Sequence, residues 1–160
     1  MQFRFRSSDL FLEPEHLFIG LRANFNLNYQ NVSQSSWHGA GVIIGRMDVC
    51  GISARTVAVE VWRSHPAANR VVACANITLQ HNRNYDFSIR TTDAGFLYLT
   101  VRDVTTNATI VNSNVDLVPL FAQMGTSYPA TSTGYFVMQG SERNLYDYTA
   151  YLTNFSVTWQ

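Results

Sequence analysis

The chain has 160 residues, a length that suits one domain, and we predict a single β-sandwich domain over residues 1–160. Its 11 basic and 11 acidic side chains cancel, which excludes a strong overall attraction to nucleic acid or to an anionic membrane. Residues 1–6 lack the continuous apolar stretch of a signal peptide, and no segment approaches the roughly 20 apolar residues of a membrane span.

The composition carries two further signals. All 11 basic residues are arginine, a bias that favours fixed contacts with carboxylates and rings unless it only reflects genome composition. Abundant Asn, Thr and Ser with little Glu is typical of secreted and virion β-proteins, so we expect an extracellular or virion-associated location.

Cys50 and Cys74 either form one disulfide or are two buried thiols, and the apolar run around Cys74 favours thiols.

Apolar and polar residues alternate along most of the chain, which is the pattern of strands with one buried and one wet face. In chain order the predicted strands are 2–6, 17–27, 41–46, 56–63, 71–79, 85–91, 96–104, 109–111, 135–139 and 149–159. Asp93-Ala94-Gly95 predicts a hairpin turn. Residues 117–124 form the one predicted helical turn, which Pro119 and Gly125 keep short. Many short strands with almost no helix predict an all-β antiparallel sandwich, with a barrel as the alternative.

The segments 56–63, 85–90 and 97–102 have polar faces that are unusually rich in large side chains. The positions concerned are Glu60, Trp62, Arg90, Tyr98 and Arg102. This mixture is the surface chemistry that recognises sugars, because a sugar ring packs its C–H face on Trp or Tyr while charged groups bind its hydroxyls. The pattern predicts a binding sheet without naming its ligand.

Five stretches carry a family resemblance through the order and texture of their strands. They are 16–23, 39–45, 57–63, 77–79 followed by 85–89, and 151–159. In these stretches the chain resembles the concanavalin A-like lectin/glucanase superfamily, which includes laminin-G-like and legume-lectin-like domains. The resemblance implies a two-sheet antiparallel jelly-roll sandwich of about ten to twelve strands, with a terminal strand that pairs back into a sheet. It also implies a concave sheet and edge loops that bind glycans.

We predict that a sugar stacks on Trp62 and Tyr98 while Glu60, Arg90 and Arg102 fix its orientation. The prediction requires Trp62, Arg90 and Arg102 to emerge from the same open side of one curved sheet. The full predicted ligand-binding set is Arg22, Asn24, Trp37, His38, Glu60, Trp62, Arg90, Tyr98 and Arg102.

Each part of this set has an alternative interpretation. The polar face is otherwise a solvated surface whose arginines pair with Glu60 and Asp86 across strands. A one-residue bulge would move part of the set to the opposite face. Trp37, beside His38 in a polar loop, either contributes to binding or folds back as a plug over the end of the sandwich.

Catalysis is not predicted. Glycosidases need two carboxyl groups facing each other across the scissile bond, and the superfamily's hydrolases carry carboxylates at i, i+2 and i+4. Here Glu60 is flanked by Ala58 and Trp62, and only folding could bring Asp86 or Asp103 to it. No cofactor is predicted, with a structural calcium ion at turn aspartates as the alternative.

The sequence thus predicts a non-catalytic, lectin-like carbohydrate-binding domain. Its expected partner is a glycan or polysaccharide, with no nucleic acid and no membrane insertion. The first alternative is a structural, assembly or adhesion module of a virion, phage tail or cell-surface protein, which would include a homo-oligomer. The second alternative is a polysaccharide-cleaving enzyme.

Overall fold

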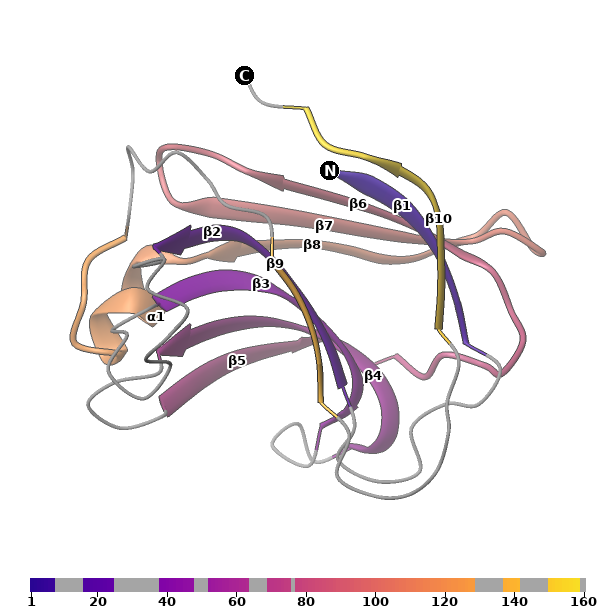
Figure 1. Cartoon of the computed structure of the whole chain (residues 1–160), viewed down its shortest axis with the longest axis horizontal. Coiled ribbons are helices and arrows are strands. Elements are labelled where there is room, and N and C mark those ends of the chain that lie inside the picture. The colour runs from indigo at the N-terminus through magenta and orange to yellow at the C-terminus, as the bar shows by residue number, and fades with distance from the viewer. Residues whose placement is uncertain are drawn as a thin grey trace, which may run out of the picture.

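Strands make up most of the part of the chain that the structure describes (Figure 1). This computed structural model describes residues 1–7, 16–24, 38–47, 52–63, 69–75, 77–128, 137–141 and 150–158. The strands are β1 (Gln2–Ser7), β2 (His16–Asn24), β3 (His38–Met47), β4 (Ile52–Arg63), β5 (Asn69–Ala75), β6 (Tyr85–Thr91), β7 (Phe96–Asp103), β8 (Thr109–Asp116), β9 (Val137–Ser141) and β10 (Ala150–Ser156). One short helix, α1, spans Val118–Gln123. No helix among these residues is long and apolar enough to cross a membrane.

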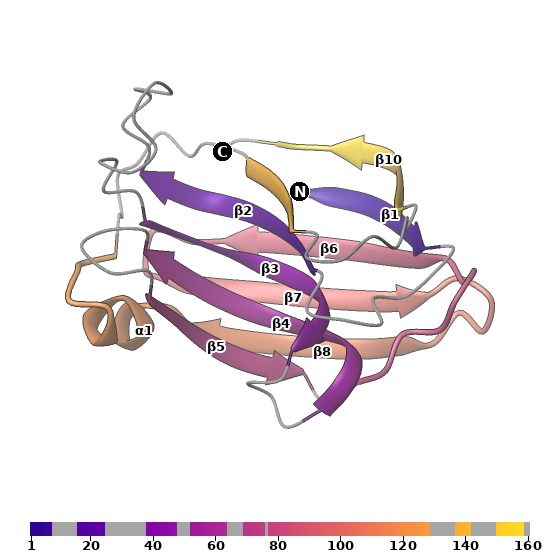
Figure 2. The ribbon, with the colours of Figure 1, turned by 60° about the horizontal axis from the view of Figure 1, so that its bottom comes forward.

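The strands form two five-stranded antiparallel sheets that face each other (Figures 1 and 2). Sheet A has the order β10-β1-β6-β7-β8, and sheet B has the order β5-β4-β3-β2-β9. Figure 2 looks onto sheet B with β6, β7 and β8 of sheet A behind it. The first and last strands, β1 and β10, lie side by side in sheet A, so segments from opposite ends of the chain share one surface.

The core lies between the sheets and is built by alternation along each strand. In sheet A, Phe3 and Phe5 of β1 and Phe87 of β6 are buried, and the Phe3 and Phe87 rings stack with centroids 4.9 Å apart. From sheet B, Val57 and Val59 of β4 enter the same apolar cluster. These β-branched and aromatic side chains suit a pleated surface that is covered on one side.

Two bulges decide which residues share a face. In β2, Gly20 pairs with Gly41 but Arg22 pairs with Ala40, so one extra residue is inserted between them. A Cβ at Gly41 would lie only 2.7 Å from the Cα of Gly20 and would also collide with the carbonyl oxygen of Ile19, which explains the glycine. In β10, the second bulge falls at Asn154, whose φ is 53°.

The short helix α1 lies at one end of the two sheets (Figure 1). The Leu117 N–H donates to the carbonyl oxygen of Gly95, which ties the start of the helix to the turn between β6 and β7. Phe121 is fully buried and meets the Tyr128 ring edge-on with centroids 5.5 Å apart. The helix therefore extends the apolar core at this end.

The structure confirms the all-β class, the two antiparallel sheets and the short helical turn near 117–124. It corrects one expectation in sheet B. The face of β4 that points away from the core was expected to be wet, yet Thr56, Ala58 and Glu60 are all buried there. Alternation gave the correct phase of the strand, but it could not show that both faces of its centre are covered.

Candidate functional site

The nine predicted ligand-binding residues are divided between the two sheets. Arg90, Tyr98 and Arg102 lie in sheet A, on β6 and β7. The predicted positions in sheet B are Arg22, Asn24, His38, Glu60 and Trp62. Trp37 lies outside the described residues. The expectation that Trp62, Arg90 and Arg102 emerge from one side of one sheet is therefore wrong, because Trp62 belongs to the other sheet.

Within sheet B, the β2 bulge separates positions that were expected to share a face. Trp62 is in register with Gly39, and Gly39 is in register with Ala23. Arg22 and Asn24 fall in the alternate rows, opposite Ala40 and His38. Paired residues of antiparallel strands occupy the same side of a sheet, so the bulge takes Arg22 and Asn24 out of the row of Trp62.

Glu60 lies in sheet B, apart from the two aspartates that the sequence analysis considered as its partners. It is only 4% exposed, and its strand phase is opposite to that of the core residues Val59 and Val61. Asp86 and Asp103 belong to sheet A. The structure therefore does not bring Glu60 together with either aspartate on one face.

The outer face of sheet A, which points away from the core, carries a compact ion-pair network. Arg4 of β1 donates two hydrogen bonds to the carboxylate of Asp86 of β6. The distances are 2.7 Å from Nε to Oδ1 and 3.0 Å from Nη2 to Oδ2. Arg102 of β7 donates to the same carboxylate at 3.1 Å and to the Asn107 side chain at 3.0 Å. Three neighbouring strands are thus linked across the face by one carboxylate.

Asp86 is held in its ionised form. The hydrogen bonds from Arg4 hold the pKa of Asp86 below its ordinary value, with a further contribution from Arg102, and they outweigh the opposing effect of partial burial. Both carboxylate oxygens accept hydrogen bonds from guanidinium groups. Asp86 therefore serves as a fixed acceptor and not as a proton donor near neutral pH.

Arg90 and Tyr98 face each other across the β6–β7 pair. The Arg90 guanidinium carbon lies 4.3 Å from the centroid of the Tyr98 ring, a cation–π contact. One face of the ring is therefore already occupied by a side chain of the protein. A sugar could stack on that face only after displacing Arg90.

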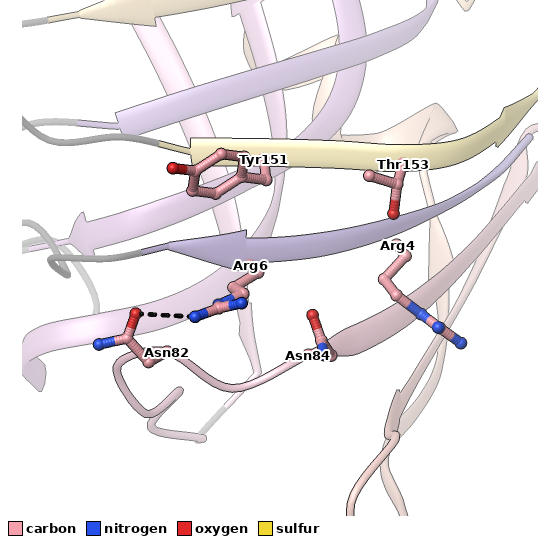
Figure 3. Close-up of a pocket in the computed structure, with 6 residues that line it drawn as sticks. All are labelled: Arg4, Arg6, Asn82, Asn84, Tyr151 and Thr153. Carbon is pink, nitrogen blue, oxygen red and sulfur yellow. Dashed lines mark hydrogen bonds between the residues drawn. The ribbon is translucent and has the colours of Figure 1, made fainter.

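A hollow of about 330 Å³ opens on the same outer face, where β10, β1 and the turn before β6 meet (Figure 3). We call it the Tyr151 hollow. Its lining residues are Arg4, Arg6, Asn82, Asn84, Tyr151 and Thr153. In Figure 3, Tyr151 and Thr153 project from β10 on one side of β1, while Asn82 and Asn84 lie on the other side. Every lining residue carries a polar group, and the Tyr151 side chain, in a residue 52% exposed, adds an accessible aromatic ring.

Two features of the backbone bring these residues together: the pairing of β1 with β10 and a hydrogen bond at the end of the turn before β6. The register pairs Arg6 with Tyr151 and Arg4 with Thr153, so the two strands alternate guanidinium and hydroxyl groups. The turn that carries Asn82 and Asn84 is fixed at its end, because the Val104 N–H donates to the Asn84 carbonyl oxygen at 3.1 Å. Asn82 adopts a φ of 55°, a left-handed conformation that asparagine tolerates better than most residues.

A second hollow of about 360 Å³ adjoins the first across Arg4. Its polar lining comes from Gln2, Ser88, Thr100, Arg102, Thr109 and Asn154, together with Arg4 and Asp86. Among the predicted site residues that the structure describes, Arg102 is the one that lines either of these two hollows. The outer face of sheet A thus offers a polar track with the Tyr151 ring at one end.

Sequence reasoning missed most of the Tyr151 hollow. It placed Tyr151, Thr153 and Phe155 on one face, but the Asn154 bulge puts Tyr151 and Thr153 on the outside while Phe155 stacks towards Phe3 with centroids 6.3 Å apart. The available signal was the strand pattern of Arg4 and Arg6 beside buried phenylalanines. Nothing in the sequence showed that residues 2–6 pair with the last strand.

Among the described residues, no group of three or more His, Cys, Asp or Glu side chains is arranged to hold a metal ion. Comparison of the chain with protein-family models, with curated proteins and with solved structures finds no match.

Proposed function

We propose that this protein is a non-catalytic carbohydrate-binding module and that the Tyr151 hollow is its principal binding site. The observation that carries the proposal is the half-exposed Tyr151 residue beside guanidinium, amide and hydroxyl groups. An accessible aromatic ring beside several hydrogen-bonding groups is a combination that suits carbohydrate recognition. The proposal keeps the carbohydrate class that the sequence predicts and moves the site to the β10–β1 side of the outer face of sheet A.

The chemistry of the hollow suits a sugar on both of its sides. The Tyr151 ring offers an apolar platform for the C–H face of a pyranose. Across β1, the amides of Asn82 and Asn84 donate and accept hydrogen bonds, as sugar hydroxyls also do. The volume of about 330 Å³ lies at the lower end of the range for ligand pockets, which suits one or two sugar units bound in the open.

A binding role is favoured over hydrolysis by the state of Asp86, the described carboxylate that lines the adjoining hollow. A general acid needs a raised pKa near the working pH, whereas the pKa of Asp86 is lowered by Arg4 and Arg102. Asp86 lines the second hollow, and none of the described residues that line the Tyr151 hollow is acidic. In the part of the chain that the structure describes, the site therefore has donors and acceptors for recognition and no pair of carboxyl groups of the kind that glycosidases use.

We further propose that the sandwich belongs to the concanavalin A-like superfamily and has jelly-roll topology. The support comes from the strand that the resemblance implied would pair back into a sheet. Residues 150–156 form β10, which pairs antiparallel with β1 at the edge of sheet A. An experimental structure with a complete strand order would test this assignment.

The function is tested by substituting the aromatic platform. We expect Tyr151→Ala to lower the affinity for a glycan identified on an array by about tenfold or more, because the stacking surface is lost. Tyr151→Phe keeps the ring and should retain most of the affinity. Isothermal titration of each variant with the array hit measures both effects.

Two results would count against the proposal. If no glycan on an array of plant, animal and microbial glycans binds, a carbohydrate is not the ligand. If the affinity for the glycan is unchanged in Tyr151→Ala, the Tyr151 hollow is not the binding site. Light scattering on the same samples covers the assembly alternative, since a stable oligomer that dissociates in Tyr151→Ala would make this face a subunit interface.

A further inference from the structure

Positive charge is concentrated on the outer face of sheet A although the chain as a whole is neutral. The described residues of β1, β6 and β7 place Arg4, Arg6, Arg90 and Arg102 on this face. Asp86 is the one carboxylate that these three strands contribute to it within the described ranges. Because Arg4 and Arg102 share that carboxylate, the network keeps an excess of positive charge beside the Tyr151 hollow.

Arg6 is the cation of this face that is best placed to meet a ligand. It is exposed at the rim of the hollow and forms no ion pair among the described residues. Its hydrogen bond to the Asn82 side chain is long, at 3.4 Å, and therefore weak (Figure 3). A guanidinium in this state can turn its two parallel N–H groups towards a carboxylate at little cost.

We infer that the carbohydrate bound in the Tyr151 hollow is acidic and that Arg6 binds its carboxylate while the sugar ring stacks on Tyr151. This inference rests on the proposed function and narrows its ligand to sugars such as uronic and sialic acids. The register supports the pairing of roles, since Arg6 and Tyr151 are directly opposite each other on adjacent strands. One monosaccharide unit can therefore reach both groups.

A neutral glycan or a general polyanion fits these observations less well. A neutral sugar would leave Arg6 without a countercharge beside the other cations of the face. A general polyanion would need charge alone, whereas the hollow combines one exposed ring with two side-chain amides. The arrangement thus favours a ligand that carries a carboxylate on a ring.

The test compares acidic glycans with their own neutral forms. The probes are polygalacturonate and alginate, each beside its carboxyl-reduced product, and sialyllactose beside lactose. We expect the acidic member of at least one pair to bind at least about tenfold more tightly, since a hydrogen bond between two charged groups is stronger than one between neutral groups. Rising salt should weaken the acidic member and leave its neutral form nearly unchanged.

Two arginine variants locate the effect. Arg6→Gln should lower affinity for the acidic glycan by about tenfold or more and leave the neutral form unaffected. Arg90→Gln is the matched control, because Arg90 lies on the same face, packs on Tyr98 and lines neither of the two hollows described. It should change affinity by less than about twofold if Arg6 acts by direct contact. Equal thermal midpoints of both variants show that the fold is kept.

The outcomes separate the inference from the function on which it rests. Equal binding of acidic and neutral forms, with dependence on Tyr151, would overturn the inference and leave carbohydrate binding intact. Equal losses in Arg6→Gln and Arg90→Gln, or equal affinity for an oligonucleotide or an anionic vesicle, would also overturn it, because charge alone would then explain binding. No binding of any glycan in the pairs or on the array would remove both proposals.

Discussion

Asp86 organises the outer face of sheet A at the scale of single residues. It binds two arginines from the strands on either side, and these contacts lower its pKa, with the Arg4 hydrogen bonds as the largest cause. A lowered pKa in the folded state means that the folded protein holds the ionised form more strongly than the unfolded chain does. The resulting stability is fully present above the unfolded pKa of about 3.9 and is lost as pH falls through the folded pKa.

Asp86→Asn tests this linkage. We expect the variant to unfold at a lower temperature than the wild type near neutral pH, because Arg4 and Arg102 lose their shared charge partner. The difference should begin to shrink as pH falls below the ordinary aspartate pKa of about 3.9. It should vanish only below the lowered folded pKa of Asp86, where the wild-type carboxylate is protonated too. Thermal unfolding followed by circular dichroism across an acidic pH series measures both midpoints. A difference that is constant over the whole series would show that Asp86 stabilises through packing instead.

The arrangement of strands into sheets was predictable where partners are close in sequence. The alternation of Tyr85, Phe87 and Ile89, followed by a turn ending at Gly95, predicts the β6–β7 hairpin, and the structure confirms it. The φ of Gly95 is 92°, a conformation that a residue with a side chain rarely adopts. The two-residue alternation of a strand and the residue types of a turn depend only on neighbouring residues, so they can be predicted from a short stretch of sequence.

Pairing between distant strands and the position of bulges were not predictable in this way. The alternating pattern of 149–159 is continuous, yet Gln2 pairs with Ser156 while Arg4 pairs with Thr153. The bulge at Asn154 reverses the faces on either side of it, which moved Phe155 away from Tyr151. The site prediction failed for a related reason, since Trp62 and Arg90 have equally good local patterns in two different sheets.

The β10 bulge gives a prediction at the scale of this element. Asn154 occupies the left-handed region, with a φ of 53°, which glycine adopts freely and a β-branched residue resists. We expect Asn154→Val to cost about 1–2 kcal/mol in stability and to weaken glycan binding, because β10 also carries Tyr151. Asn154→Gly is the control that should retain both properties.

Chemical denaturation and glycan titration of the two Asn154 variants give the comparison. If valine and glycine at this position prove equally stable, the bulge is not held by the backbone conformation of Asn154. If stability falls in the valine variant while affinity does not, the position of Tyr151 does not depend on the bulge.

At the scale of the whole molecule, the aromatic cluster of sheet A holds the two layers together. Phe87 stacks on Phe3 and meets Phe5 edge-on with ring centroids 6.1 Å apart, and the cluster continues into the buried valines of sheet B. Rings packed in this way contribute through their buried area and through their quadrupoles. Removal of one of them leaves a cavity between two sheets that cannot both move to fill it.

Phe87→Ala should therefore lower the free energy of unfolding by about 3–5 kcal/mol, a large part of the 5–15 kcal/mol typical of a domain. Phe155→Ala is the matched control, since this ring also stacks on Phe3 but Phe155 is 42% exposed. We expect a clearly smaller loss for it. Equilibrium denaturation gives both values, and equal losses would contradict the view that burial sets the cost.

The adjacency of β1 and β10 has a consequence for how recognition and folding are linked. A ligand that contacts both Arg6 and Tyr151 would bind to β1 and β10 at once, two strands that are far apart in the sequence. It would bind only molecules in which the edge strand has docked, so saturating ligand should suppress fraying of that strand by mass action. Amide hydrogen exchange along β10 should then become slower as the glycan is titrated in. The exchange rate of this edge strand would therefore measure how much of the protein is bound.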